Sequence, residues 1–329
     1  TNCYANGKKS MDAMPSVISS VPKLMEIEYL TSSYSANQVE AIPKILRKKG
    51  YETAFFHGAT NGSMNFDVFA DVTGFEHYYG RTEYDNEADF DGTWGIFDEP
   101  FLDWSVDQIS TMKKPFFSTI FTISSHPPYT IPEQYKSRFN KGPSEMHDAV
   151  SYADYALSTF FEKAQKTDWY KNTLFIIVAD HTPASGTPVY FKDMGNMHIP
   201  LIFYHPTNPF FKGRSDKVVS QTDVMPTLLH LMGHQEPFFA FGQSVFDEKD
   251  GFSASYIGDK FLYFGTYEDE HYMLLYQDEK CLGIFNLEDL LQTKNLKDNA
   301  PLKEALETAL KAMIQTYNHA LINNQMTTE

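Results

Sequence analysis

The stretch Leu174-Phe175-Ile176-Ile177-Val178-Ala179-Asp180-His181-Thr182 decides the fold, because six apolar residues run directly into a carboxylate and an imidazole. An apolar run of this length predicts a strand buried on both faces, as in a parallel sheet. In open α/β sheets, ligands bind just beyond the carboxyl ends of such strands. Asp180 and His181 offer an oxygen and a nitrogen, a combination that suits zinc or another divalent transition metal. The alternative is a loop aspartate and a surface histidine after a core strand.

Composition excludes several classes of protein. The chain has 329 residues, 42% of them hydrophobic, which is enough to bury a large α/β core. Its net charge of −16 argues against non-specific nucleic-acid binding and leaves no basic patch for anionic lipid. Cys3 and Cys281 are too far apart to indicate a disulfide framework or a zinc finger. The sequence has no signal peptide and no apolar run of the roughly 18 residues that span a bilayer.

Helical and strand-like patterns alternate over most of the chain, which is typical of an α/β fold. We expect helices over 10–20, 36–48, 99–112, 145–166 and 223–232, and strands over 51–57, 116–122, 174–179 and 199–204. After about residue 236, short strands over 253–256, 261–266, 271–276 and 282–286 predict an antiparallel meander, followed by a helix over 301–321. The sequence therefore predicts a mostly parallel central sheet flanked by helices (residues 1–235). A small antiparallel C-terminal subdomain (236–329) is expected to pack on the same domain.

Ser10 is the candidate nucleophile. It follows Asn6-Gly7-Lys8-Lys9 and begins the first expected helix. There its hydroxyl would lie near backbone N–H donors and the positive end of the helix dipole, a setting that suits attack on phosphorus or sulfur. A serine hydroxyl needs a base or a metal to become reactive. The alternative is an ordinary N-cap serine.

Two histidines also end predicted strands. His57 closes the strand over 51–57, and His126 follows the strand over 116–122. Both are therefore expected at the same edge of the sheet as Asp180 and His181, although His57 could instead be a hydrogen-bonded core residue. His198 precedes a strand, so we expect it at the opposite edge, where it is a weaker candidate ligand.

Taken together, these motifs resemble the sulfatase-like alkaline phosphatase superfamily, most closely its lipoteichoic acid synthase (phosphoglycerol transferase) branch. The resemblance covers nearly the whole chain in the correct order. Its motifs are Ser10 with its flanks, Tyr-x-Thr-Ala-x-Phe-His-Gly at 51–58, Ser-Ser-His at 124–126, Asp180-His181, and Ser-Gln-Thr-Asp-x-x-Pro-Thr-Leu-Leu at 220–229. The last two are fairly specific in combination, and each is weak alone.

The resemblance implies roles for four of these residues. Ser10 matches the nucleophilic threonine of the branch and would form a covalent phospho-enzyme. Asp180 and His181, with Ser10, match ligands of a divalent metal, typically Mn²⁺, or Zn²⁺ in the related phosphoethanolamine transferases. The metal would lower the pKa of the serine hydroxyl and offset charge on the phosphoryl oxygens. His126 matches a histidine that contacts the phosphoryl group or assists the leaving group.

The resemblance also implies a substrate groove. His57, Lys9 and Trp94 are the predicted substrate-binding residues, and the substrate would be a phospholipid or a phosphorylated glycan. Asp98 and Glu99 fall in a loop near this groove. We interpret Asp223 as a helix cap.

Two departures from the family pattern narrow the function. Met11-Asp12-Ala13-Met14 follows Ser10 in place of x-Pro-x-Arg, so the sulfatase nucleophile cannot be made and sulfate-ester hydrolysis is not expected. Met64 and Phe66 stand where the branch has a tryptophan and an arginine, which removes a phosphate-clamping cation. Arg81 is a candidate replacement for that cation.

A third departure concerns the metal. The family places a metal-binding glutamate at the end of a strand upstream of the nucleophile, and the nine residues before Ser10 contain no strand followed by an acidic residue. The metal set is therefore one ligand short of a closed tetrahedral site. We expect a longer natural protein with that strand and an N-terminal membrane anchor, its catalytic domain facing outward from a bacterial cell membrane.

The expected function is metal-dependent transfer of a phosphoglycerol-like group from a lipid or glycan donor. The alternatives are a phosphoethanolamine transferase, a phosphodiesterase, or a non-catalytic module that binds phosphorylated glycans. The missing acidic ligand is the main support for the non-catalytic module.

Overall fold

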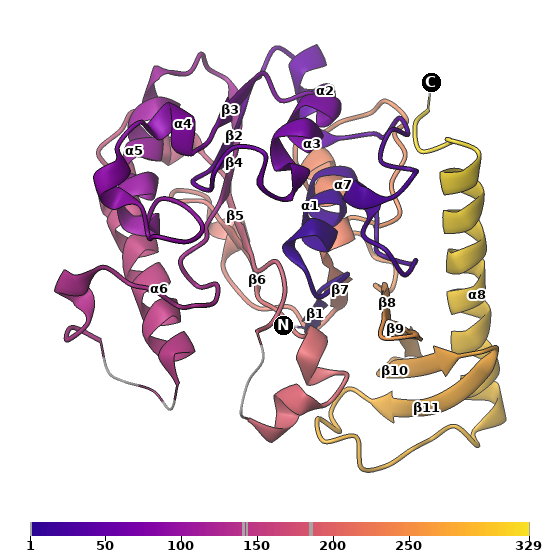
Figure 1. The fold of residues 1–329 in the computed structure, drawn as a ribbon. Coiled ribbons are helices and arrows are strands. Elements are labelled where there is room, and N and C mark those ends of the chain that lie inside the picture. Colours follow the sequence, from indigo (N-terminus) through magenta and orange to yellow (C-terminus); the bar gives the residue numbers. More distant parts are fainter. Residues whose placement is uncertain (1, 140–141, 143, 184–186, 329) are drawn as a thin grey trace. The chain divides into compact units, whose positions relative to one another are not determined.

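The computed structural model describes residues 2–139, 142, 144–183 and 187–328, and Figure 1 shows its elements. The α-helices are α1 (Ser10–Ser19), α2 (Ile42–Lys48), α3 (Phe66–Thr73), α4 (Arg81–Tyr84), α5 (Asp98–Thr111), α6 (Glu145–Ala164), α7 (Val224–Leu231) and α8 (Ala300–Ile322). The strands are β1 (Asn2–Tyr4), β2 (Glu52–His57), β3 (His77–Tyr79), β4 (Phe116–Phe121), β5 (Phe175–Val178), β6 (Leu201–Tyr204), β7 (Val218–Ser220), β8 (Ser253–Ile257), β9 (Lys260–Tyr267), β10 (Glu270–Gln277) and β11 (Lys280–Asn286).

The chain forms two compact units. The first unit combines residues 1–42, 175–204 and 210–329, and the second holds 43–174 and 205–209. The C-terminal strands thus pack with the segment that carries Ser10. The division near residue 235 stays a prediction.

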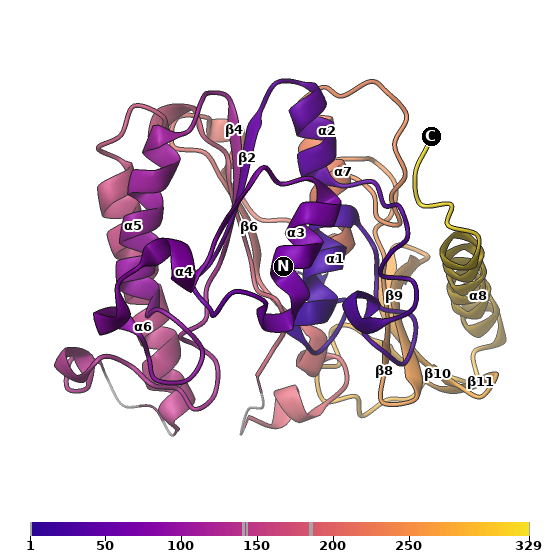
Figure 2. The ribbon, with the colours of Figure 1, turned by 45° about the horizontal axis from the view of Figure 1, so that its top comes forward.

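The second unit is built on a parallel sheet of order β3-β2-β4. Its central strand β2 is buried from Thr53 to His57, because it has a neighbour on each edge and helices on both faces. Figure 2 shows α5 and α6 on one face of this sheet and α3 on the other. His57 pairs in register with Phe121, so β2 and β4 end at the same edge, as expected for parallel strands.

In the first unit, β1 pairs in parallel with β7. The other edge of β1 bonds to the segment before β6, with Ala5 N–H donating to Met197 O (2.8 Å) and Ile199 N–H to Cys3 O (2.9 Å). The helices α1 and α7 lie side by side in Figures 1 and 2.

The β5 strand differs from its prediction. It is half-buried along its length rather than buried on both faces, and it pairs antiparallel to β6, with Val178 opposite Leu201. A parallel pair needs a crossover, usually a helix, whereas the described residues between β5 and β6 form only the 3-10 turns η6 (Pro188–Phe191) and η7 (Gly195–Met197). Consequently β6 begins at the edge where β5 ends, and the expectation that His198 lies at the opposite edge is wrong.

The C-terminal meander is confirmed. Among the described residues it forms a four-stranded sheet of order β11-β10-β9-β8 in which all neighbours are antiparallel. Side chains alternate between its faces. One face, with Phe264 and Met273, joins the core around β1 and β7, and the long helix α8 packs against the sheet (Figure 1).

The helix expected over 36–48 is confirmed only from Ile42 onward. Before it, Val39 forms an isolated parallel bridge to Met326, and Glu40 N–H donates to Met326 O (2.9 Å). Pro43 explains the late start, because proline lacks an N–H and suits the first turn of a helix rather than its interior. The sequence also missed β1, β3 and β7, whose three residues each are too few to show a period.

The expected α/β class with a small antiparallel C-terminal sheet is confirmed by this arrangement. Within the described part of the chain, no helix combines the length and the hydropathy that a membrane span requires.

The β9–β10 hairpin generates a test of backbone strain. Its turn residues Glu268 and Asp269 have φ of 48° and 63°, the left-handed region that a two-residue turn requires. Replacing them with Asn-Gly should stabilise the protein by about 1 kcal/mol, because these residues reach that region at lower cost. Urea unfolding measures the change. As a control, the same Asn-Gly pair in place of Lys303-Glu304, inside α8, should lower the free energy of unfolding, because glycine is unfavourable within a helix. A hairpin variant less stable than the wild type would contradict the prediction.

Candidate functional site

Local turn chemistry places Ser10 at the start of α1. Asp12 Oδ2 accepts the backbone N–H groups of Lys8 (3.1 Å) and Lys9 (3.2 Å), which closes the turn in front of the helix. A side chain at Gly7 would overlap the carboxyl group of Asp12, so only glycine fits there. The sequence Gly-x-x-Ser-x-Asp therefore fixes the serine at the first residue of the helix.

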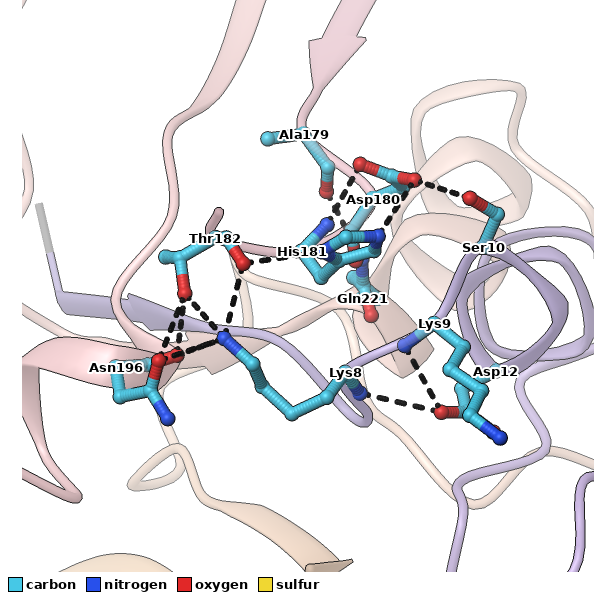
Figure 3. A network of polar contacts seen from close by, with 10 residues as sticks. All are labelled: Lys8, Lys9, Ser10, Asp12, Ala179, Asp180, His181, Thr182, Asn196 and Gln221. Carbon is cyan, nitrogen blue, oxygen red and sulfur yellow. Dashed lines mark hydrogen bonds and ion pairs between the residues drawn. The ribbon is translucent and has the colours of Figure 1, made fainter. Parts of the chain in front are cut away.

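Ser10, Asp180 and His181 meet in the first unit (Figure 3). Ser10 Oγ donates a hydrogen bond to Asp180 Oδ2 (2.7 Å), and His181 Nε2 lies 3.4 Å from the same oxygen. His181 Nδ1 lies 3.0 Å from Thr182 O. Because a carbonyl only accepts, Nδ1 carries the proton, and Nε2 of the neutral ring keeps its lone pair. The structure thus brings together the residues predicted as nucleophile and metal ligands.

The donor chemistry of this trio fits a divalent metal in part. A hydroxyl oxygen, a carboxylate oxygen and an imidazole nitrogen are ligands that Mn²⁺ and Zn²⁺ accept. No group of three or more His, Cys, Asp or Glu side chains suited to a metal occurs within the described ranges. Three of the four positions of a tetrahedral site would be filled from this chain, and the metal roles stay predictions.

A buried glutamine joins the end of β5 to the nucleophile loop. Gln221 Nε2 donates to Ala179 O (2.9 Å) and Asp180 O (2.7 Å), and its Oε1 accepts Asn6 N–H (2.9 Å). Gln221 is fully buried. The motif at 220–229 contains this residue, but the sequence pattern assigned no role to its side chain. The signal that the sequence offers is the place of this glutamine inside the motif at 220–229.

Asp223 supports the same region. Its carboxylate accepts the N–H groups of Ser220 and Gln243, both at 2.8 Å, and burial raises its pKa to about 7. The sequence predicts that Asp223 caps a helix. Its carboxylate caps the 3-10 turn η9 (Gln221–Asp223) by accepting the N–H of Ser220, and it does not cap α7.

The two lysines before Ser10 point in different directions. Lys9, a predicted substrate-binding residue, forms an ion pair with Glu28, and its side chain is 64% exposed. Lys8, for which the sequence predicted no role, turns its ammonium group toward Thr182 and Asn196 beside the site (Figure 3).

In the second unit, a buried carboxylate anchors the loop that carries His126. Asp98 begins α5, and its carboxylate accepts the N–H groups of Ile123 (2.8 Å) and Ser124 (3.1 Å). Burial raises the pKa of Asp98 to about 6. Asp98, which the sequence placed near the groove, thus holds the backbone after β4 in place.

Trp94 and His126 form a pair at the end of this loop. Trp94 Nε1–H donates to Pro127 O (2.7 Å), and its ring lies edge-on to the His126 ring with centroids 4.5 Å apart. His126 Nδ1 donates to the same carbonyl (2.8 Å), which leaves Nε2 with a lone pair. Trp94 therefore orients His126, and its predicted contact with substrate stays a prediction.

His57 lies in the core. It has 0% exposure, Nδ1 is 3.3 Å from Tyr78 Oη, and burial lowers its pKa to about 4, so the ring is neutral. Phe66 packs against the ring with centroids 5.0 Å apart. The ring is thus buried like that of a core residue, but its Nε2 has no hydrogen-bond partner among the described residues, and the substrate-groove role of His57 stays a prediction. Arg81 pairs with Glu87 and lies 3.6 Å from the centroid of the Phe90 ring.

Comparisons with known proteins agree with these motifs. A family model described as Sulfatase matches residues 1–234. Lipoteichoic acid synthase 1 of Bacillus subtilis is 26% identical over 231 residues, which are 64% of this chain and 36% of that protein. Lipoteichoic acid synthase of Staphylococcus saprophyticus is 29% identical over 226 residues, 61% of this chain and 34% of that protein. The chain thus spans about a third of the length of these curated relatives.

Solved structures share the fold. A protein of the alkaline phosphatase superfamily from Vibrio parahaemolyticus superposes with a TM-score of 0.85 at 27% identity, covering 100% of this chain and 79% of that chain. The lipoteichoic acid synthase LtaP from Listeria monocytogenes gives a TM-score of 0.77 at 20% identity, with 98% and 83% coverage, a likeness in fold alone.

The buried carboxyl group of Asp223 predicts a pH dependence of stability. Its pKa is about 7 in the folded chain and about 4 when unfolded, so its stabilising contribution is complete below pH 4 and is lost as pH rises through 7. Relative to Asp223→Asn, the wild type should lose about 2–3 kcal/mol of unfolding free energy between pH 5 and pH 8. Urea unfolding of both proteins at the two pH values measures this. Asp259→Asn, at an exposed turn, is the control, and an equal difference at both pH values would refute the assignment.

The Trp94–His126 pair predicts an energetic coupling. Trp94→Phe keeps an aromatic ring but removes the donor to Pro127, so we expect a loss of about 1 kcal/mol in stability. A double-mutant cycle of Trp94→Ala with His126→Ala, in which each change removes one ring, should give a coupling of about 0.5–1.5 kcal/mol between the two rings. A coupling of zero would show that the rings do not support each other.

Proposed function

This chain belongs to the sulfatase family, and we propose that it is a metal-dependent phosphotransferase. It moves a phosphoglycerol-like group from a lipid or glycan donor through a phospho-Ser10 intermediate. The observation that carries the proposal is the convergence of Ser10 Oγ and His181 Nε2 on Asp180 Oδ2, at 2.7 and 3.4 Å. The named relatives, two lipoteichoic acid synthases, support the choice of phosphorus chemistry.

The first step is attack by Ser10. Its hydroxyl already donates to Asp180, so the carboxylate holds the proton side of the oxygen away from the incoming phosphorus. The oxygen–phosphorus bond forms as the bond to the departing alcohol breaks, and the serine proton passes to Asp180, which returns it to Ser10 Oγ when the acceptor displaces the serine. Because Ser10 is the first residue of α1, the attacked group would lie near the positive end of the helix dipole, which favours its negative charge.

The second step releases the group to an acceptor. From the family resemblance alone, we assign proton transfer to His126; its Nδ1 donates to Pro127 O, so Nε2 of the neutral ring carries a lone pair. As imidazolium it gives a proton to the departing alcohol in the first step. As neutral imidazole it then accepts the proton of the acceptor hydroxyl, whose oxygen displaces Ser10 from phosphorus.

Asp180, His181 and Ser10 are the residues that would hold the metal, with Mn²⁺ favoured and Zn²⁺ possible. When bound, the metal would lower the pKa of the serine hydroxyl and offset charge on the phosphoryl oxygens. The hydrogen bond from His181 to Thr182 O presents Nε2 as a ligand.

The setting of the reaction follows from the proposed substrate. We place the catalytic domain on the outer side of a bacterial cell membrane, with a phospholipid or a phosphorylated glycan as partner. A phosphoethanolamine transferase or phosphodiesterase remains the alternative within the same chemistry. An observed preference for zinc and for an amine-bearing headgroup would favour it.

Trapping of phosphate on Ser10 tests the proposal. With Mn²⁺ or Zn²⁺ and a phosphoglycerol lipid, mass spectrometry should find the group on Ser10, and Ser10→Ala should lower turnover by about 10³-fold or more. Asp180→Asn should also abolish trapping. Ser158→Ala, at an exposed serine of α6, is the matched control. Metal binding without any covalent product would favour the non-catalytic glycan-binding module.

A further inference from the structure

The ammonium group of Lys8 sits in a cage of neutral oxygens. Nζ lies 2.9 Å from Thr182 O, 2.6 Å from Thr182 Oγ1, 3.0 Å from Asn196 O and 2.7 Å from Asn196 Oδ1 (Figure 3). An ammonium ion has three N–H donors and no acceptor, so four oxygens at these distances use all of them. This is the environment of a compact bound cation rather than of a surface lysine.

The contacts of Lys8 differ from those of a solvated or an ion-paired lysine. A solvated lysine would extend into water, whereas the Lys8 side chain is partly buried and burial lowers its pKa. An ion-paired lysine would donate to a carboxylate, whereas the hydrogen bonds of Lys8 Nζ go to two carbonyls, a hydroxyl and a side-chain amide. The ammonium group therefore holds these four oxygen atoms of Thr182 and Asn196 in place.

One of those groups also orients the candidate metal ligand. Thr182 O accepts from Lys8 Nζ and from His181 Nδ1 (3.0 Å). The ammonium thus holds the carbonyl that selects the imidazole tautomer and turns Nε2 toward Asp180. Thr182 Oγ1 donates to Asn196 O (2.6 Å), which closes the cage on its other side.

The contacts of Lys8 join three segments that are far apart in the sequence. Lys8 lies two residues before the candidate nucleophile, Thr182 follows β5, and Asn196 lies in η7, before β6. Because β5 and β6 are antiparallel, the last two segments arrive at the same edge. A single side chain therefore ties the nucleophile loop to both of them.

We propose that Lys8 is a positioning residue that fixes Thr182 O and thereby sets the orientation of His181 for metal binding. Lys8 acts as a tethered monovalent cation, and it touches neither substrate nor metal. The metal part of this inference rests on the proposed function, while the effect on the His181 ring does not.

Chemical rescue of Lys8→Ala tests the cage directly. The variant should bind Mn²⁺ about 10- to 100-fold more weakly than the wild type, the usual effect of losing a group that orients a ligand. Ammonium chloride at about 0.1 M should restore most of the affinity, because the free ion carries the same donors as the lost side chain. Guanidinium at the same low concentration is planar and larger, so it should not. Calorimetry measures the affinities.

Nitrogen NMR of His181 supplies a readout that does not need metal. The wild-type ring should be the Nδ1–H tautomer, Lys8→Ala should give a mixture, and ammonium should return the single tautomer. Lys217→Ala is the matched control, because its Nζ also donates to a carbonyl, Asp247 O (2.8 Å), away from this cage. If Lys8→Ala does not fold, Lys8→Met provides a flexible side chain without charge or N–H donors for the tautomer and metal-affinity measurements.

The outcomes separate the two proposals. An unchanged tautomer in Lys8→Ala, or the absence of any ammonium effect on a perturbed ring, would overturn the role of Lys8. A wild type that binds no metal would remove the metal part of this proposal together with the proposed function, and the tautomer experiment would still decide whether Lys8 orients His181.

Discussion

The candidate site depends on one buried amide. Gln221 donates to the carbonyls at the end of β5 and accepts the N–H of Asn6, so a single side chain joins three segments that are far apart in the sequence. A buried amide costs free energy unless its donors and acceptor are paired. The donors and the acceptor of Gln221 are all paired with backbone groups. Moving one of these segments would break such a bond and would therefore lower the stability of the fold. The geometry of Ser10 against Asp180 follows from that constraint.

Around this link the polar groups divide into two kinds. Ser10, Asp180 and His181 present hydroxyl, carboxylate and imidazole atoms to one another, and these can take part in chemistry. Lys8 and Asp12 make their hydrogen bonds to backbone or neutral groups, and they hold the first group in place. The same division occurs in the second unit, where Asp98 and Trp94 support His126. The candidate catalytic atoms of each unit are thus oriented by hydrogen-bonded neighbours.

His57 lies in an aromatic cluster. Phe66 packs on its ring, which is buried and neutral, and Phe55 and Phe121 also contact the ring. The buried Nε2 of His57 has no hydrogen-bond partner among the described residues. The substrate-groove role of His57 stays a prediction.

Local sequence patterns were sufficient to predict the α/β class, most of the long helices and strands, the C-terminal meander, and the grouping of Ser10 with Asp180 and His181. Periodicity, apolar runs and motif order carry that information because they are read from neighbouring residues. Three features emerged only from the folded chain: the antiparallel pairing of β5 with β6, the burial of His57, and the approach of Lys8 rather than Lys9 to the site. Strand direction, burial and the partner of a long side chain depend on contacts between distant segments, and no local pattern records those contacts.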